Sequence, residues 1–284
     1  MTGRTLYVSD LDGTLLRSNE RTSDYTNSVI NRLTEQGMIF SYATARSYHT
    51  ARKVTAGLIA NIPLIVYNGA FVIDNQTGKH LLENYFDQSA DNLLDDLFAH
   101  GIFPIVYSFI GGAEKFSFVQ ESATRGMQLF LDSRKGDIRR NAVPAPEDLK
   151  AGRKFYITCI DAPEKLKPLY EKYRDQYHCV YQIDMYSGEQ WLEIMPQAAS
   201  KSNAVRQLKA LLHCERVIAF GDGQNDIDMF QAADEGYAVA NADAELKQYA
   251  AAVIPSNDED GVAKWLAQHF DETGSGPVQE RVIW

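Results

Sequence analysis

The sequence contains little cysteine and no block of basic residues. Cys159, Cys179 and Cys214 are its only cysteines, and they are widely spaced with no Cys-x-x-Cys pair. We therefore expect reduced thiols and a cytoplasmic protein rather than a disulfide framework. Acidic residues outnumber basic ones by 38 to 28, which gives a formal net charge of -10. This balance argues against nucleic acid or an anionic membrane as a partner, so an anionic ligand would need locally arranged positive groups.

Long apolar runs and several functional motifs are absent as well. No run reaches the ~18 apolar residues of a membrane span, and the N-terminus lacks the pattern of a signal peptide, so we expect no membrane association. The six histidines show no His-x-x-x-His spacing, which disfavours a zinc centre. Gly-x-Ser-x-Gly, Walker A and Gly-x-Gly-x-x-Gly patterns are also missing, so nothing supports a hydrolase triad, a P-loop or a dinucleotide site.

Two carboxylates follow the first apolar segment. Thr5–Ser9 is typical of a short buried strand and is followed by Asp10 and Asp12, which alternation along an extended segment places on the same side. Unit charges ~4 Å apart repel by ~4 kcal/mol at an effective dielectric constant of about 20, so a bound cation or a shifted pKa must relieve them. A polar turn explains these residues equally well. A calcium loop does not, because Thr14 and Arg21 stand where that motif needs acidic ligands.

The first segments alternate between strand and helix patterns. Ser23–Gln36 has apolar residues at helical spacing and ends at Gly37, whereas Met38–Ala43 and Leu64–Tyr67 are typical of buried strands. Alternation of this kind predicts a parallel sheet with helices on its faces. We therefore expect an α/β protein with a Rossmann-like core.

This alternation is interrupted between residues 84 and 188, where adjacent strands have fewer helices between them. We expect an inserted α+β domain there, with Asn141–Gly152 as a surface loop because of its prolines. The core would then consist of residues 1–83 and 189–270, and the Gly/Ser/Pro-containing segment 271–284 would be a flexible tail.

Polar side chains recur where predicted parallel strands end or the next helix begins. A turn can explain each of them separately, but it does not predict that all of them fall at one edge of one sheet, where ligands bind in open α/β sheets. The residues concerned are Asp10, Asp12, Thr44, Lys201, Asp222 and Asp226.

These residues stand in four segments that resemble the ordered motifs of haloacid-dehalogenase-like phosphatases: Asp10–Leu15, Thr44, Lys201 and Gly221–Asp226. The insertion after the third strand resembles the large α/β cap of the Cof-like branch. Two further segments are similar to patterns of that branch, namely Asn68–Ala70 and Asn257–Val262. The resemblance therefore covers nearly the whole chain and implies a catalytic core with an inserted cap that selects the substrate.

The resemblance assigns roles to the acidic residues. It implies that Asp10 attacks phosphorus to form an aspartyl phosphate and that Asp12 protonates the leaving oxygen and later deprotonates water. Mg²⁺ would be held by Asp10, the backbone carbonyl of Asp12 and Asp222, with Asp226 as a ligand or as a partner of the ligands.

The resemblance also implies a phosphate-binding set. Thr44 and Lys201 would bind phosphate oxygens, together with backbone N–H groups of Leu11 and Ala45 and the side chain of Asn225. Arg46 could reach the substrate, but pairing with a surface acid is the simpler expectation.

Three positions depart from the family pattern, because Ala45, Ala198 and Ser202 stand where the family usually has glycine. A side chain there removes easy access to positive φ and could tighten or tilt the phosphate site. Every catalytic functional group is still present, so we expect activity to survive these changes.

We therefore expect a Mg²⁺-dependent phosphatase that acts on a small phosphorylated metabolite, such as a sugar phosphate or a phosphorylated cofactor. Two alternatives remain open: a phosphotransferase or mutase built on the same core, and a catalytically silent metabolite-binding regulatory protein. Nothing in the sequence chooses between a monomer and a homodimer.

Overall fold

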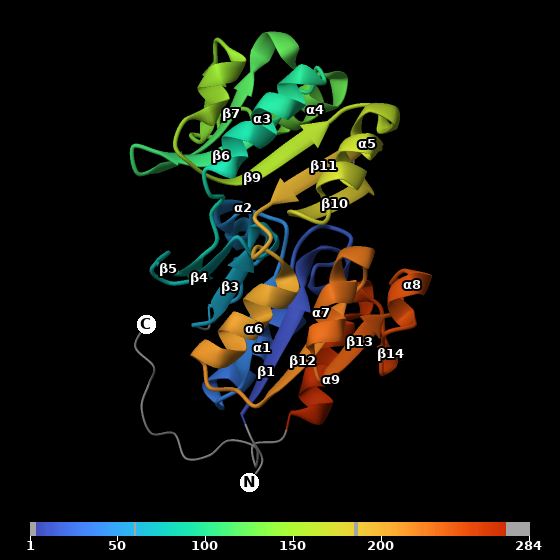
Figure 1. Cartoon of the computed structure of the whole chain (residues 1–284). Helices are drawn as coiled ribbons and strands as arrows, with labels where there is room; N and C mark the ends of the chain where they lie inside the picture. The colour runs from blue at the N-terminus through green and yellow to red at the C-terminus, as the bar shows by residue number, and fades with distance from the viewer. Residues whose placement is uncertain (1–3, 60, 185–186, 271–284) are drawn as a thin grey trace. The chain divides into compact units, whose positions relative to one another are not determined.

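A computed structural model describes residues 4–59, 61–184 and 187–270. The chain divides into two compact units (Figure 1). Met1–Glu83 and Ser200–Trp284 form the first, here called the core unit, and Asn84–Ala199 forms the second, here called the inserted unit.

The core unit is built on an eight-stranded sheet whose central strand is β1. Pairing is parallel from β14 to β3, as predicted for the alternating segments, and antiparallel at β4 and β5, which form a hairpin. In sheet order the strands are β14 (Ala252–Ile254), β13 (Glu235–Val239), β12 (Arg216–Gly221), β1 (Thr5–Asp10), β2 (Ile39–Ala43), β3 (Pro63–Val66), β4 (Phe71–Asp74) and β5 (His80–Glu83).

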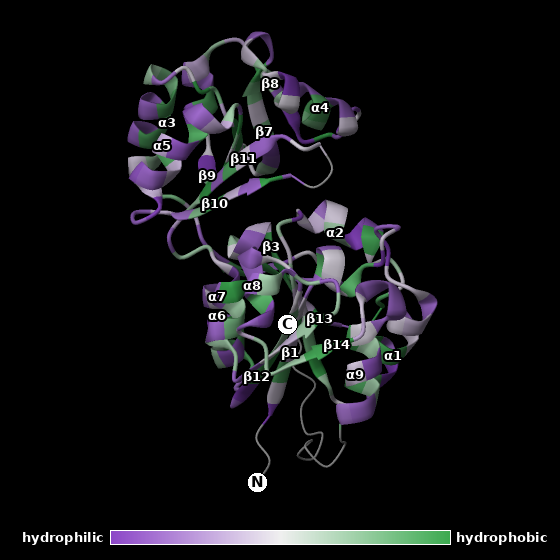
Figure 2. Cartoon of the chain, turned by 90° about the vertical axis from the view of Figure 1, so that its right-hand side faces the viewer, coloured by the Kyte–Doolittle hydropathy of each residue, from purple (hydrophilic) through white to green (hydrophobic). Residues whose placement is uncertain are grey.

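Helices cover both faces of this sheet, with α1 and α9 on one face and α6 and α7 on the other (Figure 2). Helix α1 begins after Ser23, whose Oγ accepts a hydrogen bond from the Thr26 N–H, and it buries Val29, Ile30 and Leu33. The described helices of the core unit are α1 (Asp24–Glu35), α2 (Tyr48–Val54), α6 (Lys201–Leu211), α7 (Ile227–Ala232), α8 (Ala244–Lys247) and α9 (Gly261–His269).

The inserted unit has its own six-stranded sheet, in which every pairing except that of β7 with β8 is antiparallel. Its apolar cluster joins helices α3 and α5 to the sheet through Leu97, Leu166 and Ile157. In sheet order the strands are β10 (His178–Ile183), β11 (Gln190–Met195), β9 (Arg153–Ile160), β6 (Ile105–Ile110), β7 (Ala113–Val119) and β8 (Arg140–Val143); the helices are α3 (Ser89–Ala99), α4 (Arg125–Ser133) and α5 (Pro163–Tyr173).

The structure corrects two boundaries. The insertion does not end at residue 188, because β11 lies between β10 and β9 and residues up to Ala199 belong to the inserted unit. Asn141–Gly152 is not all loop, since β8 pairs with β7 and a 3₁₀ turn spans Pro146–Lys150. The predicted tail 271–284 lies outside the described residues. Among the helices of the described part of the chain, none has the length and apolarity that crossing a membrane requires.

Candidate active site

The predicted catalytic residues of the core unit converge where β1, β2 and β12 end. Asp10 is the last residue of β1, which is hydrogen-bonded to β2 on one side and to β12 on the other. Thr44 directly follows β2, and Asp222 directly follows β12. Lys201 is the first residue of α6. Parallel pairing therefore brings together residues that are about two hundred positions apart in the sequence, as the sequence predicted.

Lys201 joins two of the carboxylates. Its Nζ donates to Asp10 Oδ1 at 2.6 Å and to Asp226 Oδ1 at 2.7 Å. All three side chains are buried, with exposed fractions of 2% for Lys201, 7% for Asp10 and 0% for Asp226. A buried ammonium needs such partners because leaving water costs several kcal/mol per ion. Lys201 is therefore not a solvated residue at a helix start.

Backbone groups hold the loop after β12 in place. Asp226 Oδ2 accepts hydrogen bonds from the N–H groups of Asp222 and Gly223, at 3.1 and 3.2 Å. A Cβ at Gly221 would lie 2.7 Å from the same oxygen, so the backbone must lack a side chain there. Asp226 thus orders the loop with one oxygen and binds Lys201 with the other.

Asp222 is positioned by the turn after β1. Thr14 Oγ1 donates to Asp222 Oδ1 at 2.8 Å. Gly13 has a φ of 78°, and a Cβ there would lie 2.2 Å from Asp222 Oδ2. Glycine is required at this position for its conformation and for the space that Asp222 fills. The sequence did not indicate the role of Thr14, which only the approach of the two loops makes visible.

Carboxylate oxygens of Asp10, Asp222 and Asp226 lie within 4.8 Å of one another. Four carboxylates, including Asp12, outnumber the two cations of the site, Lys201 and Arg46. Hard oxygen donors in this number suit Mg²⁺, which also keeps water and substrate oxygens as ligands. The donor set therefore fits a divalent cation.

Burial and mutual proximity shift the pKa values of the charged groups in this site. Burial, more than the neighbouring charges, raises the pKa of Asp10 well above its usual range, although Lys201 acts to lower it. Burial and the Asp226 carboxylate raise the pKa of Asp222 to about 7. For Lys201, burial favours the neutral amine, but Asp10 and Asp226 outweigh that effect and raise its pKa. A cation bound between the carboxylates would relieve the same repulsion.

Asp12 is held by Arg46, a contact that the sequence did not predict. Arg46 Nε donates to Asp12 Oδ2 at 2.8 Å and Nη2 to Asp12 Oδ1 at 2.5 Å, the paired geometry of a guanidinium with a carboxylate. Nη2 also reaches Glu20 at 2.9 Å. Pairing with a surface acid was expected, and Glu20 is such an acid, but the main partner is the predicted proton donor. The position of Arg46 two residues after Thr44 was the available signal.

The predicted phosphate-binding residues show different degrees of organisation. Thr44 is 1% exposed, and its Oγ1 accepts the Arg46 N–H at 3.1 Å, so it does shape the following turn. Leu11 is buried at the start of the Asp12 turn. Asn225 lies in the 3₁₀ turn Gln224–Asp226. For Leu11, Ala45 and Asn225 the structure fixes the place in the fold, and contact with phosphate stays a prediction.

A second turn supports Thr44 and Lys201. Asn68 N donates to Thr44 O at 2.9 Å, and Tyr67 N donates to Arg46 O at 3.0 Å. Gly69 has a φ of 97°, and a Cβ there would lie 2.3 Å from the carbonyl oxygen of Ser200, the residue before Lys201. The Asn68-Gly69 pair, noted in the sequence only as a family pattern, thus packs the end of β3 against the start of α6.

The three departures from glycine cause no backbone strain. The described non-glycine residues with positive φ do not include Ala45, Ala198 or Ser202. Ser202 lies in the first turn of α6, where its Oγ is 2.9 Å from that of Ser200. These positions therefore do not need the conformational freedom of glycine.

This fold agrees with comparisons with known proteins. The sequence model of the haloacid dehalogenase-like hydrolases matches residues 7–266, and the chain belongs to this family. Curated relatives of this chain are named as phosphatases.

Among curated proteins, a 5-amino-6-(5-phospho-D-ribitylamino)uracil phosphatase of Bacillus subtilis is 26% identical over 93% of this chain and 97% of its own length. A putative phosphatase of Buchnera aphidicola subsp. Acyrthosiphon pisum is 30% identical over 93% of this chain and 95% of its own length. Of the solved structures, a haloacid dehalogenase-like hydrolase from B. subtilis matches with a TM-score of 0.75 at 23% identity, over 95% of this chain and 100% of that one. This structural match shows the common fold.

Proposed function

We propose that the protein is a Mg²⁺-dependent phosphatase that works through an aspartyl phosphate on Asp10. The observation that carries the proposal is the double contact of Lys201 with Asp10 and Asp226 beside the carboxylate group of Asp222. A buried ammonium that touches the nucleophile can also meet an incoming phosphoryl oxygen. Phosphoryl transfer needs mainly positioning and charge neutralisation, and this site offers both.

In the first step, a carboxylate oxygen of Asp10 bonds to phosphorus while the bond between phosphorus and the leaving oxygen breaks. Asp12 gives its proton to that oxygen. In the second step, water attacks the same phosphorus and loses a proton to Asp12, and the Asp10 carboxylate is released with inorganic phosphate. Bound Mg²⁺, held by Asp10, Asp222 and the Asp12 carbonyl with support from Asp226, would neutralise charge on the transferring group.

The Arg46 contact fits the proton role of Asp12. The paired guanidinium fixes the orientation of the Asp12 carboxyl group. The side chain of Asp12 remains 29% exposed, so a leaving group or water can still reach it. Arg46 therefore acts as a positioning residue for Asp12 in this proposal.

We propose a small phosphorylated metabolite as the substrate. Support comes from the curated relative named for a phosphorylated ribitylamino-uracil, which combines a sugar-alcohol phosphate with a heterocycle. A sugar phosphate or a phosphorylated cofactor is the corresponding class for this chain. The inserted unit, Asn84–Ala199, would select among such compounds. A cytoplasmic location and a monomeric or homodimeric state stay predictions.

The test is release of inorganic phosphate from a panel of sugar phosphates, pyridoxal phosphate, flavin mononucleotide and nucleotides, with Mg²⁺ and with chelator. Asp10→Asn keeps the shape of the side chain and should lower turnover at least about 1,000-fold, because it removes the nucleophile. Asp175→Asn, an exposed position in the inserted unit, is the matched control and should retain full activity. Full activity of Asp10→Asn would refute the mechanism.

A second assay separates hydrolysis from transfer. Brief mixing with substrate and acid quenching should trap phosphate on the wild-type protein and not on Asp10→Asn. If the trapped group passes to an added sugar faster than to water, the protein is a phosphotransferase on the same site. If metabolites bind tightly with no release and no trapping, it is a binding protein.

A further inference from the structure

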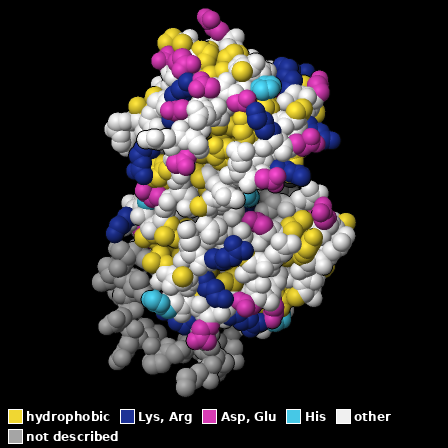
Figure 3. Space-filling view, in the orientation of Figure 1, with side chains coloured by type: hydrophobic (Ala, Val, Ile, Leu, Met, Phe, Trp, Pro, Cys, Tyr) yellow, Lys and Arg dark blue, Asp and Glu magenta, His cyan; other side chains and the backbone are white. Residues whose placement is uncertain are grey.

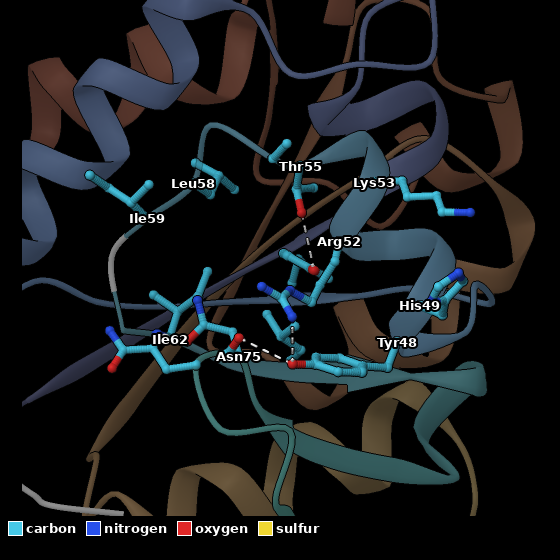
Figure 4. A pocket seen from close by; sticks show the side chains of 13 residues that line it. Tyr48, His49, Arg52, Lys53, Thr55, Leu58, Ile59, Ile62 and Asn75 are labelled. Carbon is cyan, nitrogen blue, oxygen red and sulfur yellow. Dashed lines mark hydrogen bonds between the residues drawn. The ribbon is translucent and has the colours of Figure 1, made fainter. Parts of the chain in front are cut away.

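A cavity of the core unit lies apart from the candidate active site. It has a volume of about 520 Å³, within the range of small-molecule sites. Helix α2, four residues between Thr55 and Ile59, Ile62, parts of β2 and β3, and the turn at Asn75 and Gln76 line it (Figure 4). None of the predicted catalytic, metal-binding or phosphate-binding residues is among its lining residues.

The charged groups that line this cavity are all cationic or titrate to a cation. Arg52, Lys53 and His49 belong to its lining, and no Asp or Glu does. Within the described ranges of the chain, none of these three side chains forms an ion pair. The cavity is therefore locally positive on a protein with a net charge of -10, which favours an anion there.

Arg52 is aimed into the cavity. Figure 4 shows its guanidinium reaching from α2 toward the space between Tyr48 and Ile62, whereas the Lys53 and His49 side chains extend in the opposite direction. Its carbon Cζ lies 5.5 Å from the centre of the Tyr48 ring, and Nη1 is 3.4 Å from the Tyr48 hydroxyl. These are weak contacts for a guanidinium, which leaves most of its donors available for a carboxylate, sulfonate or phosphate group.

The floor of the cavity holds a buried hydroxyl. Tyr42 is 1% exposed, and its hydroxyl has Thr55 Oγ1 at 3.4 Å, a long contact. Thr55 Oγ1 donates its own proton to Ala51 O at 2.9 Å. The Tyr42 O–H thus has only a long contact with Thr55, and it can donate a hydrogen bond to a polar group of a bound ligand.

The remaining walls are apolar and firmly placed. Leu58, Ile59, Ile62 and Leu64 contribute apolar surface to the lining, and Ile59 is 74% exposed, which is unusual for isoleucine. Asn75 Oδ1 accepts the Ile62 N–H at 3.0 Å, and the Tyr48 hydroxyl donates to Asn75 O at 3.2 Å. Hydrogen bonds therefore connect the turn at Asn75 to α2 and to Ile62, and the cavity between them is preformed.

We propose that this cavity is a second ligand site that takes a small organic anion with a flat apolar body. The anionic group meets Arg52, with Lys53 adding positive potential. The apolar body lies against Ile59 and Ile62, and a polar atom at its far end accepts from Tyr42. This site is independent of the proposed phosphatase reaction, because it shares no residue with the machinery assigned above.

The test uses anilinonaphthalene sulfonate as the probe, since it combines one anionic group with flat rings, and inorganic sulfate as a probe of charge alone. Binding to the full-length protein is followed by fluorescence and located by amide chemical shifts in a two-dimensional NMR titration. We expect saturable binding of the sulfonate, shifts centred on residues 48–59 and 75–76, and much weaker binding of sulfate.

Arg52→Gln should weaken binding roughly tenfold, the effect of losing one charge-assisted contact. Arg52→Lys should fall between Arg52→Gln and the wild type. Tyr42→Phe should weaken binding about threefold, as expected for one hydrogen bond. Arg32→Gln, an exposed arginine on α1, is the matched control and should bind normally.

Unchanged affinity in both Arg52 variants, shifts centred elsewhere, or no saturation at millimolar probe would overturn the proposal. Shifts centred on Asp10 and Lys201 would also overturn it, because the probe would then report the active site. Phosphate release by Arg52→Gln should equal that of the wild type, so failure of this site and failure of the proposed phosphatase are distinguishable.

Discussion

The core unit and the inserted unit both bury basic side chains, but the acidic partners of these side chains come from different parts of the sequence. In the core unit, Lys201 is bound by Asp10 and Asp226, which come from two other elements far away in the sequence. In the inserted unit, Arg139 is 8% exposed and pairs with Asp137, two residues away, and with Glu114. Arg139 and Lys201 thus each have two carboxylate partners, but the core site places a third carboxylate, that of Asp222, beside those of Asp10 and Asp226. An excess of buried charge of one sign marks the place where a ligand belongs.

The largest expected effect is a difference in turnover between variants of Lys201 and Arg139. Lys201→Met should lower turnover about 100-fold to 1,000-fold, since in the proposed mechanism Lys201 donates to the transferring phosphoryl group. Arg139→Met should leave turnover per folded molecule within about twofold, although breaking a buried pair costs about 3–5 kcal/mol in the free energy of unfolding. Urea denaturation and steady-state kinetics on both variants measure the two quantities. Equal losses of turnover would mean that Lys201 is a structural cation like Arg139.

A smaller loss of activity is expected at Asp226. Asp226→Asn keeps the side-chain volume and one acceptor for the backbone N–H groups, but it removes a charge from the Lys201 contact and from the group that could hold a metal. We expect turnover to fall about tenfold to 100-fold, with saturation at higher Mg²⁺. Kinetics against Mg²⁺ concentration test this, and an unchanged Mg²⁺ dependence would place Asp226 outside metal binding.

Arg46→Gln should have a moderate effect, because Arg46 acts through Asp12. We expect turnover to fall about tenfold, because the Asp12 carboxyl would lose the two contacts that fix its orientation for proton transfer. Arg46→Lys should restore part of the activity. Steady-state kinetics measure this effect, and wild-type turnover in Arg46→Gln would show that Asp12 does not need the contact.

The smallest expected effect concerns pH and metal. The folded-state pKa of Asp222 is raised to about 7 from 3.8. In metal-free protein, the stability that this group contributes is therefore present below about pH 4 and lost as the pH rises through about 7. Mg²⁺ must displace the proton, so its affinity should increase up to about tenfold for each unit between pH 5.5 and 7.

Titration calorimetry in two buffers of different ionisation enthalpy measures the protons released when Mg²⁺ binds. Proton release at pH 6 that disappears near pH 8 is the expected result. Binding without proton release at pH 6 would contradict it. The equivalent titration of Asp222→Asn should show weaker binding and less proton release.

The strand ends of the core unit could be predicted because they depend on local patterns. Thr5–Asp10 and Arg216–Gly221 are short apolar segments followed by Asp and Gly, and parallel pairing places their ends together. The end of the insertion could not be predicted in this way. The alternating residues of β11 suit either sheet, and its pairing with β9 and β10 depends on contacts that are distant in the sequence.

Contacts between loops could not be predicted from the sequence either. The pairing of Arg46 with Asp12, the support of Asp222 by Thr14, and the approach of Gly69 to Ser200 all join segments that are not neighbours in the chain. Their residue types are common in ordinary turns, so spacing alone could not assign them. Only the folded backbone shows that these turns meet at the candidate active site.

The position of β1 between β2 and β12 also determines the order in which the enzyme can mature on the ribosome. Asp10 is translated early, but β12 and Lys201 follow the whole inserted unit. Because domains fold as units during synthesis, the inserted unit can fold while β1 still has one open edge. The nascent chain thus carries Asp10, the proposed nucleophile, before the lysine that binds it has been made, and the complete site can form only in the last third of translation.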